Sequence, residues 1–147
     1  MTFRAFIVED SSTIRVNLIE TLKELAGFEP VGMAETEHEA KRRLARKDDW
    51  DLAIIDLFLR EGSGLNVVEA LRNRNPNQKV VVLSNHSSRD VRWRCSQLGA
   101  DAVFDKSTEL EDLVAYCIQR RELDAGDGKG GAGLTAAPEK ALPVTPA

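Results

Sequence analysis

The sequence has no long apolar segment. No run of apolar residues approaches the roughly 20 that a helix needs to cross a bilayer. No basic stretch followed by an apolar one marks a targeting segment. We therefore expect a cytoplasmic protein without a membrane partner.

Cysteine is also scarce, and neither sign of charge prevails. The two cysteines, Cys95 and Cys117, lie far apart and lack the spacing of metal ligands, which argues against a disulfide framework or a thiolate site. The net charge is -4, and the 30% of residues that are charged mix both signs. A basic segment at 41–47 has no interleaved aromatic residues on which bases could stack. These features predict no DNA partner.

What the chain does contain is a regular alternation of short apolar runs and amphipathic segments. The apolar runs predict strands over residues 3–8, 30–33, 52–55, 79–84 and 101–104. Helices are expected between Ser11 and Gly27, over 37–47, from Leu65 to the break at Asn75 and Pro76, over 88–98 and from Leu110 to at least Ile118. Two strands separated by a helix cannot form a tight hairpin, so the repeats require parallel pairing through right-handed crossovers.

The predicted fold is therefore α/β, a doubly wound five-stranded parallel sheet with five helices, and it occupies residues 1–123 as one domain. From Asp124 the composition changes to Gly, Ala, Pro and charged residues. Such a segment buries too little apolar area to order itself. Residues 124–147 are predicted to form a flexible, disordered tail.

Polar side chains stand at the ends of four of these apolar runs: Glu9 and Asp10, Asp56, Ser84 and Lys106. In open α/β sheets, ligands bind beyond the carboxyl ends of the strands, so these groups are expected to meet there. Three carboxylates make a hard oxygen site suited to Mg²⁺, with Mn²⁺ as an alternative. Asp10 and Asp56 are expected to be direct ligands.

This arrangement predicts phosphoryl transfer to an aspartate. Asp56 would attack an incoming phosphoryl group while the cation and the Lys106 ammonium neutralise its oxygens, and Ser84 would donate to a third oxygen. Three adjacent carboxylates repel one another, so in the site without a cation the pKa of one of them is expected to rise. Lys106 would partly relieve this repulsion.

These residues, together with Gly64 and the Gly99-Ala100-Asp101 motif, resemble the CheY-like receiver domain of two-component response regulators over residues 3–121. The resemblance implies the flavodoxin-like strand order 2-1-3-4-5. It also implies that Asp56 takes its phosphoryl group from a sensor histidine kinase or a histidine phosphotransfer protein. Mg²⁺ would be held by Asp10, Asp56 and the backbone carbonyl of Phe58, with Glu9 acting through water.

Three positions depart from the family pattern. Ser107 replaces the usual proline after Lys106, and a non-proline cis bond costs about 3 kcal/mol, so a trans bond and an altered loop are expected. Val103 replaces the aromatic switch residue, with Phe104 on the opposite strand face. Arg60 replaces a proline after the third strand, which predicts a looser loop.

The helix over 88–98 carries a candidate output surface. Trp93 stands among Arg89, Arg92 and Arg94, and an exposed aromatic beside cations can anchor a protein partner. The simpler interpretation is a half-buried Trp with solvated arginines. Ser84, Val103, Trp93 and Arg92 are the residues assigned to switching and output.

Three functions remain open from the sequence. The preferred one is a stand-alone receiver that changes the binding of an unknown protein effector and catalyses at most its own phosphorylation and dephosphorylation. A second is a Mg²⁺-dependent phosphohydrolase, but Phe58 stands two residues after Asp56, where a second acid would serve turnover. The third is a receiver-like adaptor that binds its partner without phosphorylation, which Val103 and Ser107 favour.

Overall fold

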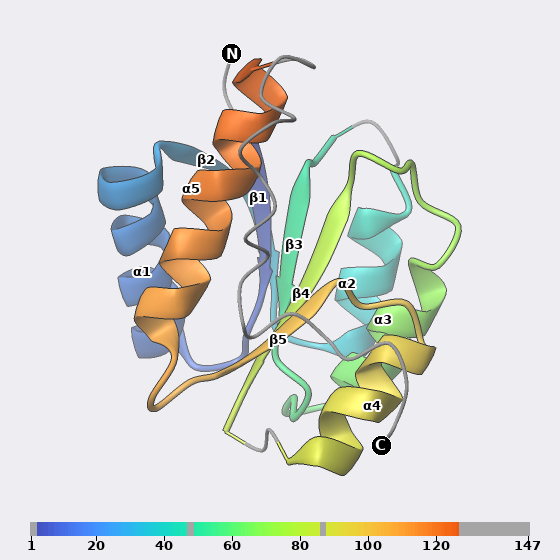
Figure 1. The fold of residues 1–147 in the computed structure, drawn as a ribbon. Coiled ribbons are helices and arrows are strands. Elements are labelled where there is room, and N and C mark those ends of the chain that lie inside the picture. Colours follow the sequence, from blue (N-terminus) through green and yellow to red (C-terminus); the bar gives the residue numbers. More distant parts are fainter. Residues whose placement is uncertain (1–2, 47–48, 86–87, 127–147) are drawn as a thin grey trace.

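Five parallel strands form a single central sheet in the computed structural model, which describes residues 3–46, 49–85 and 88–126 (Figure 1). The strands are β1 (Phe3–Val8), β2 (Phe28–Ala34), β3 (Leu52–Ile55), β4 (Lys79–Ser84) and β5 (Ala102–Asp105). Their order across the sheet is β2-β1-β3-β4-β5. The predicted fold class and strand order are confirmed.

Helices cover both faces of the sheet. They are α1 (Ser12–Thr21), α2 (Glu37–Leu44), α3 (Gly64–Ala70), α4 (Arg89–Gln97) and α5 (Leu110–Gly126). A π-helical turn, η1 (Leu22–Ala26), continues α1 until Gly27, whose positive φ of 68° ends it. The helices α1 and α5 lie on one face, and α2, α3 and α4 lie on the other (Figure 1).

Four of these helices begin at a hydroxyl side chain that caps them. Ser11, Thr36, Ser63 and Ser88 each accept a hydrogen bond from a backbone N–H in the first turn of the helix that follows. Each cap lies in the loop that leaves the carboxyl end of a strand. The same loops carry the candidate site residues, so helix capping also fixes the backbone near them.

Side chains alternate between two buried cores, one on each face of the sheet. On the face of α2, α3 and α4 the core includes Val8, Ile55 and Val103. On the face of α1 and α5 it includes Leu22 and Phe104. Val103 and Phe104 therefore point to opposite faces, as predicted, and both are fully buried.

The sequence predicts an apolar stripe on the first helix, made of Ile14, Leu18, Leu22 and Leu25, and half of this prediction is wrong. Leu18 and Leu22 are buried, but Ile14 is 36% exposed and Leu25 is 60% exposed. The buried face is completed instead by Ala26 and by the charged Arg15. The π-helical turn contributes to the exposure of Leu25 and the burial of Ala26, because it rotates these last residues relative to a regular helix.

The last helix extends beyond the predicted end of the domain. α5 runs to Gly126, so residues 124–126 are helical rather than part of the tail. The remainder of the predicted tail, residues 127–147, lies outside the described residues. Within the described chain, no helix combines the length and the apolar character needed to cross a membrane.

Gly64, at the start of α3, packs tightly against the backbone at the end of β3. A β-carbon at Gly64 would collide with the Asp56 carbonyl oxygen and lie 2.7 Å from the Leu57 Cα. Although alanine favours helices, Gly64→Ala should therefore destabilise the fold by about 2 kcal/mol, measured by urea denaturation. Glu69→Ala, on the exposed surface of the same helix, should change stability by less than about 0.5 kcal/mol. Equal stability of the two variants would contradict this packing argument.

Candidate functional site

The predicted site residues converge at one edge of the sheet, at the carboxyl ends of four strands. β1 and β3 are neighbours, and the Asp56 N–H donates to the Val8 carbonyl at 2.9 Å, which places Asp56 beside Glu9. Ser84 is the last residue of β4 and pairs with Asp105 of β5. The fold thus brings together groups from positions 9 to 106.

Three carboxylates form a cluster at this edge. Glu9, Asp10 and Asp56 each offer an oxygen, and these oxygens lie within 4.8 Å of one another. The side chains of Glu9 and Asp56 are only 3% and 6% exposed, and Asp10 is half-buried. A compact set of oxygen donors with one open side suits a hard divalent cation that keeps several waters.

Lys106 bridges two of the acids. Its Nζ lies 2.8 Å from Glu9 Oε1 and 3.1 Å from Asp56 Oδ2, and its side chain is 11% exposed. Its backbone N–H donates to the Ser84 carbonyl at 3.0 Å, which anchors the lysine to the end of β4. One cation therefore partly neutralises the cluster from within the protein.

The oxygens of the three acids are not equally engaged. Glu9 uses both: Oε1 pairs with Lys106, and Oε2 accepts from the Ser11 N–H at 3.0 Å. Among the described residues, Asp56 Oδ1 accepts only a long bond of 3.4 Å from the Phe58 N–H. In the described part of the chain, no partner contacts the Asp10 carboxylate. Asp10 and Asp56 are thus the acids whose oxygens are open to a ligand.

Burial and charge shift the pKa values of the central pair. Burial raises the pKa of Asp56 above its ordinary value, the Glu9 charge raises it further, and Lys106 offsets part of the rise. Burial alone would lower the pKa of Lys106, but its bonds to Glu9 and Asp56 outweigh that effect and raise it. The predicted upward shift of one carboxyl pKa is confirmed, and it falls on Asp56.

Two other predicted site residues flank the cluster. Ser84 is fully buried at the end of β4. Phe58 follows Asp56 by two residues, and its side chain is 58% exposed. The Phe58 backbone pairs with Ser63 in an isolated antiparallel bridge, so the segment after β3 forms a tight loop beside Asp56.

The loop after β5 has an arrangement that needs no proline. The bond between Lys106 and Ser107 is trans, as predicted. Asp105 Oδ1 accepts hydrogen bonds from the Ser107 N–H at 2.8 Å, the Ser107 hydroxyl at 2.6 Å and the Thr108 N–H at 3.2 Å. A carboxylate that caps its own turn therefore holds the loop that carries Lys106.

The loop after β3 is better anchored than the sequence predicted, so the expectation of a loose loop is not supported. Arg60 pairs with Glu35 at 2.9 Å. The Glu37 N–H donates to the Glu61 carbonyl at 3.0 Å, and Glu37 Oε1 accepts from the Ser63 N–H at 2.9 Å. Contacts with the β2–α2 segment thus replace the rigidity that a proline would give.

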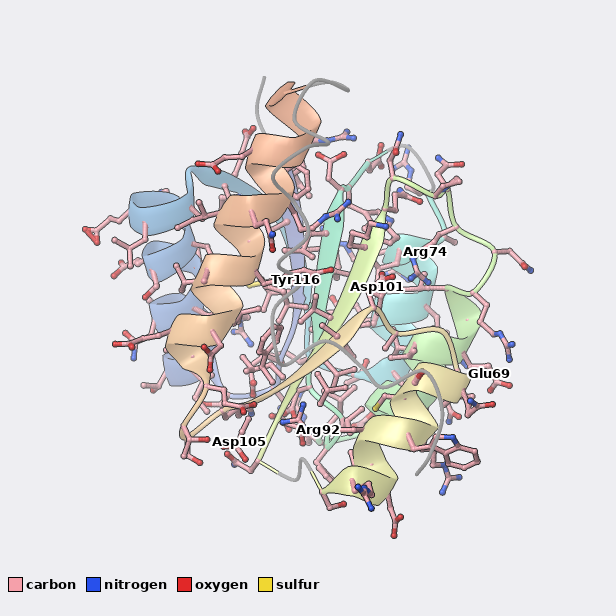
Figure 2. All side chains as sticks on the ribbon, viewed as in Figure 1. Glu69, Arg74, Arg92, Asp101, Asp105 and Tyr116 are labelled. Atoms are coloured by element: carbon pink, nitrogen blue, oxygen red, sulfur yellow. The ribbon has the colours of Figure 1, made fainter. Side chains whose placement is uncertain are left out.

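The arginines of the candidate output surface do not share one role. Arg89 and Arg94 are exposed and Trp93 is 36% exposed, as the sequence suggested. Arg92 instead points inward: it donates to the Val103 carbonyl at 2.8 Å and pairs with Glu109 at 2.9 Å. Arg92 and Asp105 both lie at the carboxyl end of β5 (Figure 2). The alternative of a solvated Arg92 is wrong because β5 is an edge strand whose outer carbonyls need donors, and the assignment of Arg92 to output stays a prediction.

The Gly99-Ala100-Asp101 motif has a structural role at the opposite edge of the sheet. Asp101 Oδ2 accepts from Arg74 at 2.7 Å and from the Val80 N–H at 2.8 Å (Figure 2). Gly99 has a φ of 106°, which glycine adopts without strain. The motif fixes the start of β5 and contributes no group to the acidic cluster.

Sequence reasoning missed Arg15 and Glu35 beside the cluster. Arg15 is buried, donates to the Glu9 carbonyl at 2.7 Å and pairs with Glu35 at 3.1 Å. Arg15 shares a helix face with Leu18 and Leu22, and this spacing was the available signal. Glu35 follows the second strand just as Glu9 and Asp56 follow the first and third.

The raised pKa of Asp56 predicts that its charge destabilises the fold when no cation is bound. The Asp56 carboxyl loses its proton near the ordinary pKa of 3.8 in the unfolded chain, whereas the folded protein keeps this proton to higher pH. The free energy of unfolding therefore falls as pH rises from the unfolded pKa to the folded pKa of Asp56. With EDTA at neutral pH, Asp56→Asn should therefore melt a few degrees above wild type, and the difference should vanish as pH falls toward 3.8. Thermal melts over this range test it, with the exposed Asp49→Asn as control. A lower melting temperature for Asp56→Asn at neutral pH would contradict the sign.

The chain matches a family model described as the response regulator receiver domain over residues 5–118. The photosynthetic apparatus regulatory protein RegA of Rhodovulum sulfidophilum is 32% identical over 116 residues, which cover 79% of this chain and 62% of RegA. The transcriptional regulatory protein PdtaR of Mycobacterium tuberculosis is 33% identical over 130 residues, which cover 86% of this chain and 62% of PdtaR. The chain thus spans about three fifths of the length of these relatives.

A solved structure shows the same fold. It is a response regulator from Burkholderia pseudomallei with a phosphorylated aspartic acid, a calcium ion and citrate, and it superposes with a TM-score of 0.69. Its identity to this chain is 22%, and the match covers 86% of this chain and 73% of that one. The family model covers the acidic cluster, Lys106 and all five strands apart from the first two residues of β1. The chain therefore belongs to the response regulator receiver domain family.

Proposed function

We propose that Asp56 is the phosphoacceptor of this receiver domain. The observation that carries the proposal is the position of Lys106, whose ammonium bridges Glu9 and Asp56 at the mouth of the acidic cluster. A buried lysine between two acids is suited to stabilise charge that develops on a third group placed beside them. Asp56 Oδ1 accepts only the long bond from the Phe58 N–H among the described residues, which leaves it available to that group.

The donor set fits Mg²⁺, with Mn²⁺ as an alternative. Asp10 and Asp56 would ligate the ion directly, because their oxygens are the ones left open. Glu9 would act through water, since both of its oxygens are engaged by Lys106 and Ser11. The Phe58 carbonyl, in the tight loop after β3, would complete the protein ligands. When bound, the ion supplies positive charge to the oxygens of the transferred group.

The chemical step is a displacement at phosphorus. A carboxylate oxygen of Asp56 forms the new bond to phosphorus as the bond to the donor nitrogen or oxygen breaks, and the leaving group departs with that electron pair. Lys106 keeps its ammonium next to Asp56 and donates to a phosphoryl oxygen. The Ser84 hydroxyl would donate to another oxygen from the end of β4.

The donor that fits this chemistry is a phosphohistidine of a sensor histidine kinase or of a histidine phosphotransfer protein, and a cytoplasmic location follows from that partner class. The downstream partner would be a protein effector. RegA and PdtaR are named as regulatory proteins, and PdtaR as a transcriptional one. The absence of DNA binding stays a prediction from the charge of this chain. The stand-alone architecture stays a prediction as well.

Neither alternative function gains support from a specific contact. A phosphohydrolase needs an acid or base for turnover, and Phe58 occupies the nearby position with an exposed ring. An adaptor that ignores phosphorylation does not need a lysine buried between two acids, which costs desolvation.

We also propose a route from the site to α4. Lys106 lies in the loop between β5 and α5, and Glu109 in that loop accepts from the Asp105 N–H at 2.8 Å and from Arg92 at 2.9 Å. Arg92 belongs to α4, whose exposed side carries Trp93. A shift of Lys106 toward a phosphoryl oxygen would therefore be transmitted through Glu109 and Arg92 to the Trp93 surface. This link would do the work of the aromatic residue that Val103 replaces.

Phosphorylation of Asp56 can be measured directly. With Mg²⁺ and acetyl phosphate, intact-mass spectrometry should show one phosphate on the wild type and none on Asp56→Asn or after EDTA. Lys106→Met should slow labelling about 100-fold because it removes the preformed cation. Asp51→Asn, at the amino end of the same strand, should label like wild type. Equal labelling of Asp56→Asn would assign the phosphate to another residue.

The Arg92 link predicts a separation of input from output. Arg92→Met leaves the buried Glu109 without its guanidinium and should cost about 2 kcal/mol of stability. It should also abolish the change in hydrogen exchange of α4 that beryllofluoride induces, with labelling of Asp56 within about twofold of wild type. The control is Arg89→Met, on the exposed side of the same helix. An unchanged α4 response in Arg92→Met would refute the route.

A further inference from the structure

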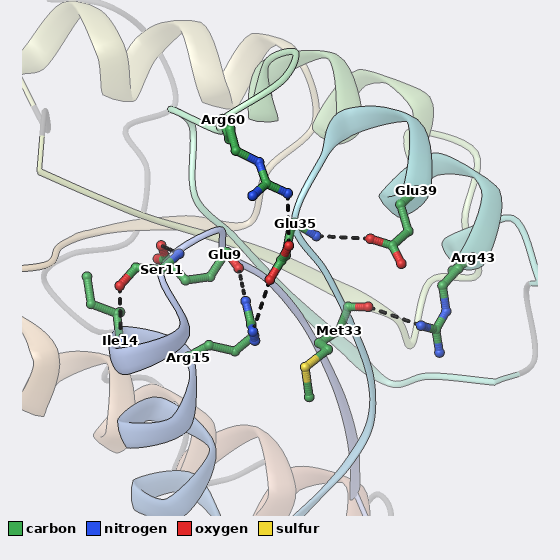
Figure 3. Close-up of polar contacts among 9 residues, drawn as sticks. All are labelled: Glu9, Ser11, Ile14, Arg15, Met33, Glu35, Glu39, Arg43 and Arg60. Carbon is green, nitrogen blue, oxygen red and sulfur yellow. Dashed lines mark hydrogen bonds and ion pairs between the residues drawn. The ribbon is translucent and has the colours of Figure 1, made fainter.

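Three charged side chains outside the acidic cluster connect the two loops on which it depends (Figure 3). Arg15 comes from the first turn of α1, Glu35 from the end of β2, and Arg60 from the loop after β3. Glu35 lies between the two arginines: its Oε2 is 3.1 Å from Arg15 and its Oε1 is 2.9 Å from Arg60. Each oxygen of the Glu35 carboxylate thus pairs with an arginine from a different element.

The Arg15 arm fixes the backbone of the first two acids. The second guanidinium nitrogen of Arg15 donates to the Glu9 carbonyl at 2.7 Å. That carbonyl belongs to the peptide group that joins Glu9 to Asp10, so its orientation sets the direction in which Asp10 leaves the strand. The arm is buried, with the Arg15 side chain 11% exposed.

The Arg60 arm fixes the loop on the other side of the cluster. Arg60 follows Phe58 by two residues, within the turn that the Phe58–Ser63 bridge closes. Its side chain is 60% exposed, so this ion pair is the weaker of the two. It holds the loop toward β2, next to the hydrogen bond from the Glu37 N–H to the Glu61 carbonyl.

Glu35 also determines where the charge of Arg15 is directed. Arg15 already contacts the Glu9 carbonyl, one peptide bond from Asp10, so without Glu35 its charge would lie next to the acidic cluster without this counter-charge. A guanidinium paired with Asp10 would compete with a metal ion for the same oxygens.

We propose that Glu35 is a positioning residue for the metal site. Glu35 holds Arg15 and Arg60, and this keeps the spacing between the Asp10 side and the Phe58 side of the site. Glu35 itself does not touch the ion. The inference rests on the proposed Mg²⁺ site and deepens it. It assigns a role to a carboxylate just after the edge strand β2 that neither the acidic cluster nor the output route uses.

Positioning and simple charge predict different signs for one variant. If the three residues acted only through their charge, Glu35→Gln would weaken Mg²⁺ binding, and Arg60→Gln would strengthen it by removing a positive group. If they act by holding the loops, both substitutions weaken binding. The sign of the Arg60→Gln effect therefore separates the two explanations.

The experiment is a Mg²⁺ titration by isothermal calorimetry on the full chain and its variants. Glu35→Gln should raise the dissociation constant about tenfold, because an amide oxygen can accept from only one of the two guanidiniums. Arg60→Gln should raise it about threefold, in keeping with its exposed arm. The double variant should bind as weakly as Glu35→Gln alone, since Arg60 acts through Glu35. Glu29→Gln, at an exposed acid within β2, should leave binding unchanged.

A kinetic measurement guards against a general loss of structure. In labelling by acetyl phosphate, Glu35→Gln should require about tenfold more Mg²⁺ for half-maximal rate and reach nearly the wild-type maximum, whereas a damaged fold would lower the maximum. Tighter binding by Arg60→Gln, or a Glu35→Gln affinity equal to that of Glu29→Gln, would overturn the inference. Absence of Mg²⁺ binding by the wild type would instead overturn the proposed function.

Discussion

The repulsion among three carboxylates gathered at one sheet edge is the constraint on which the rest of this structure depends. Carboxylate oxygens of Glu9, Asp10 and Asp56 lie within 4.8 Å of one another because β1 and β3 are adjacent and parallel, and the three acids directly follow these two strands. Lys106 offsets part of this repulsion from the end of β5. The surrounding loops are accordingly held by many polar contacts, since like charges would otherwise push the strand ends apart.

Much of the fold and of the central site could be predicted because both follow from strong local signals. Short apolar runs between amphipathic segments allow few arrangements once parallel pairing is required. Polar residues at the ends of those runs must then share one edge, so the pattern of the sequence predicts that Asp56 and Lys106 lie together. Ser11 marked the start of the first helix.

What could not be predicted depends on side-chain contacts between loops. Arg92 is assigned to the exterior by its residue type, and only the geometry shows that it bonds to the edge of β5 and to Glu109. Arg60 suggested a loose loop because it lacks the constraint of proline, yet its partner Glu35 lies far away in sequence. The exposure of Leu25 reflects a π-helical turn that periodicity alone does not reveal.

The order of the site residues along the chain has a consequence for biosynthesis. All three acids precede Lys106, and β5 lies at the edge of the sheet, so the cation that balances them is the last site group to leave the ribosome. A nascent chain that ends before β5 would gather the acids without their counter-charge. The final strand and helix therefore add electrostatic balance as well as apolar burial, and completion of the domain is expected to be cooperative rather than stepwise.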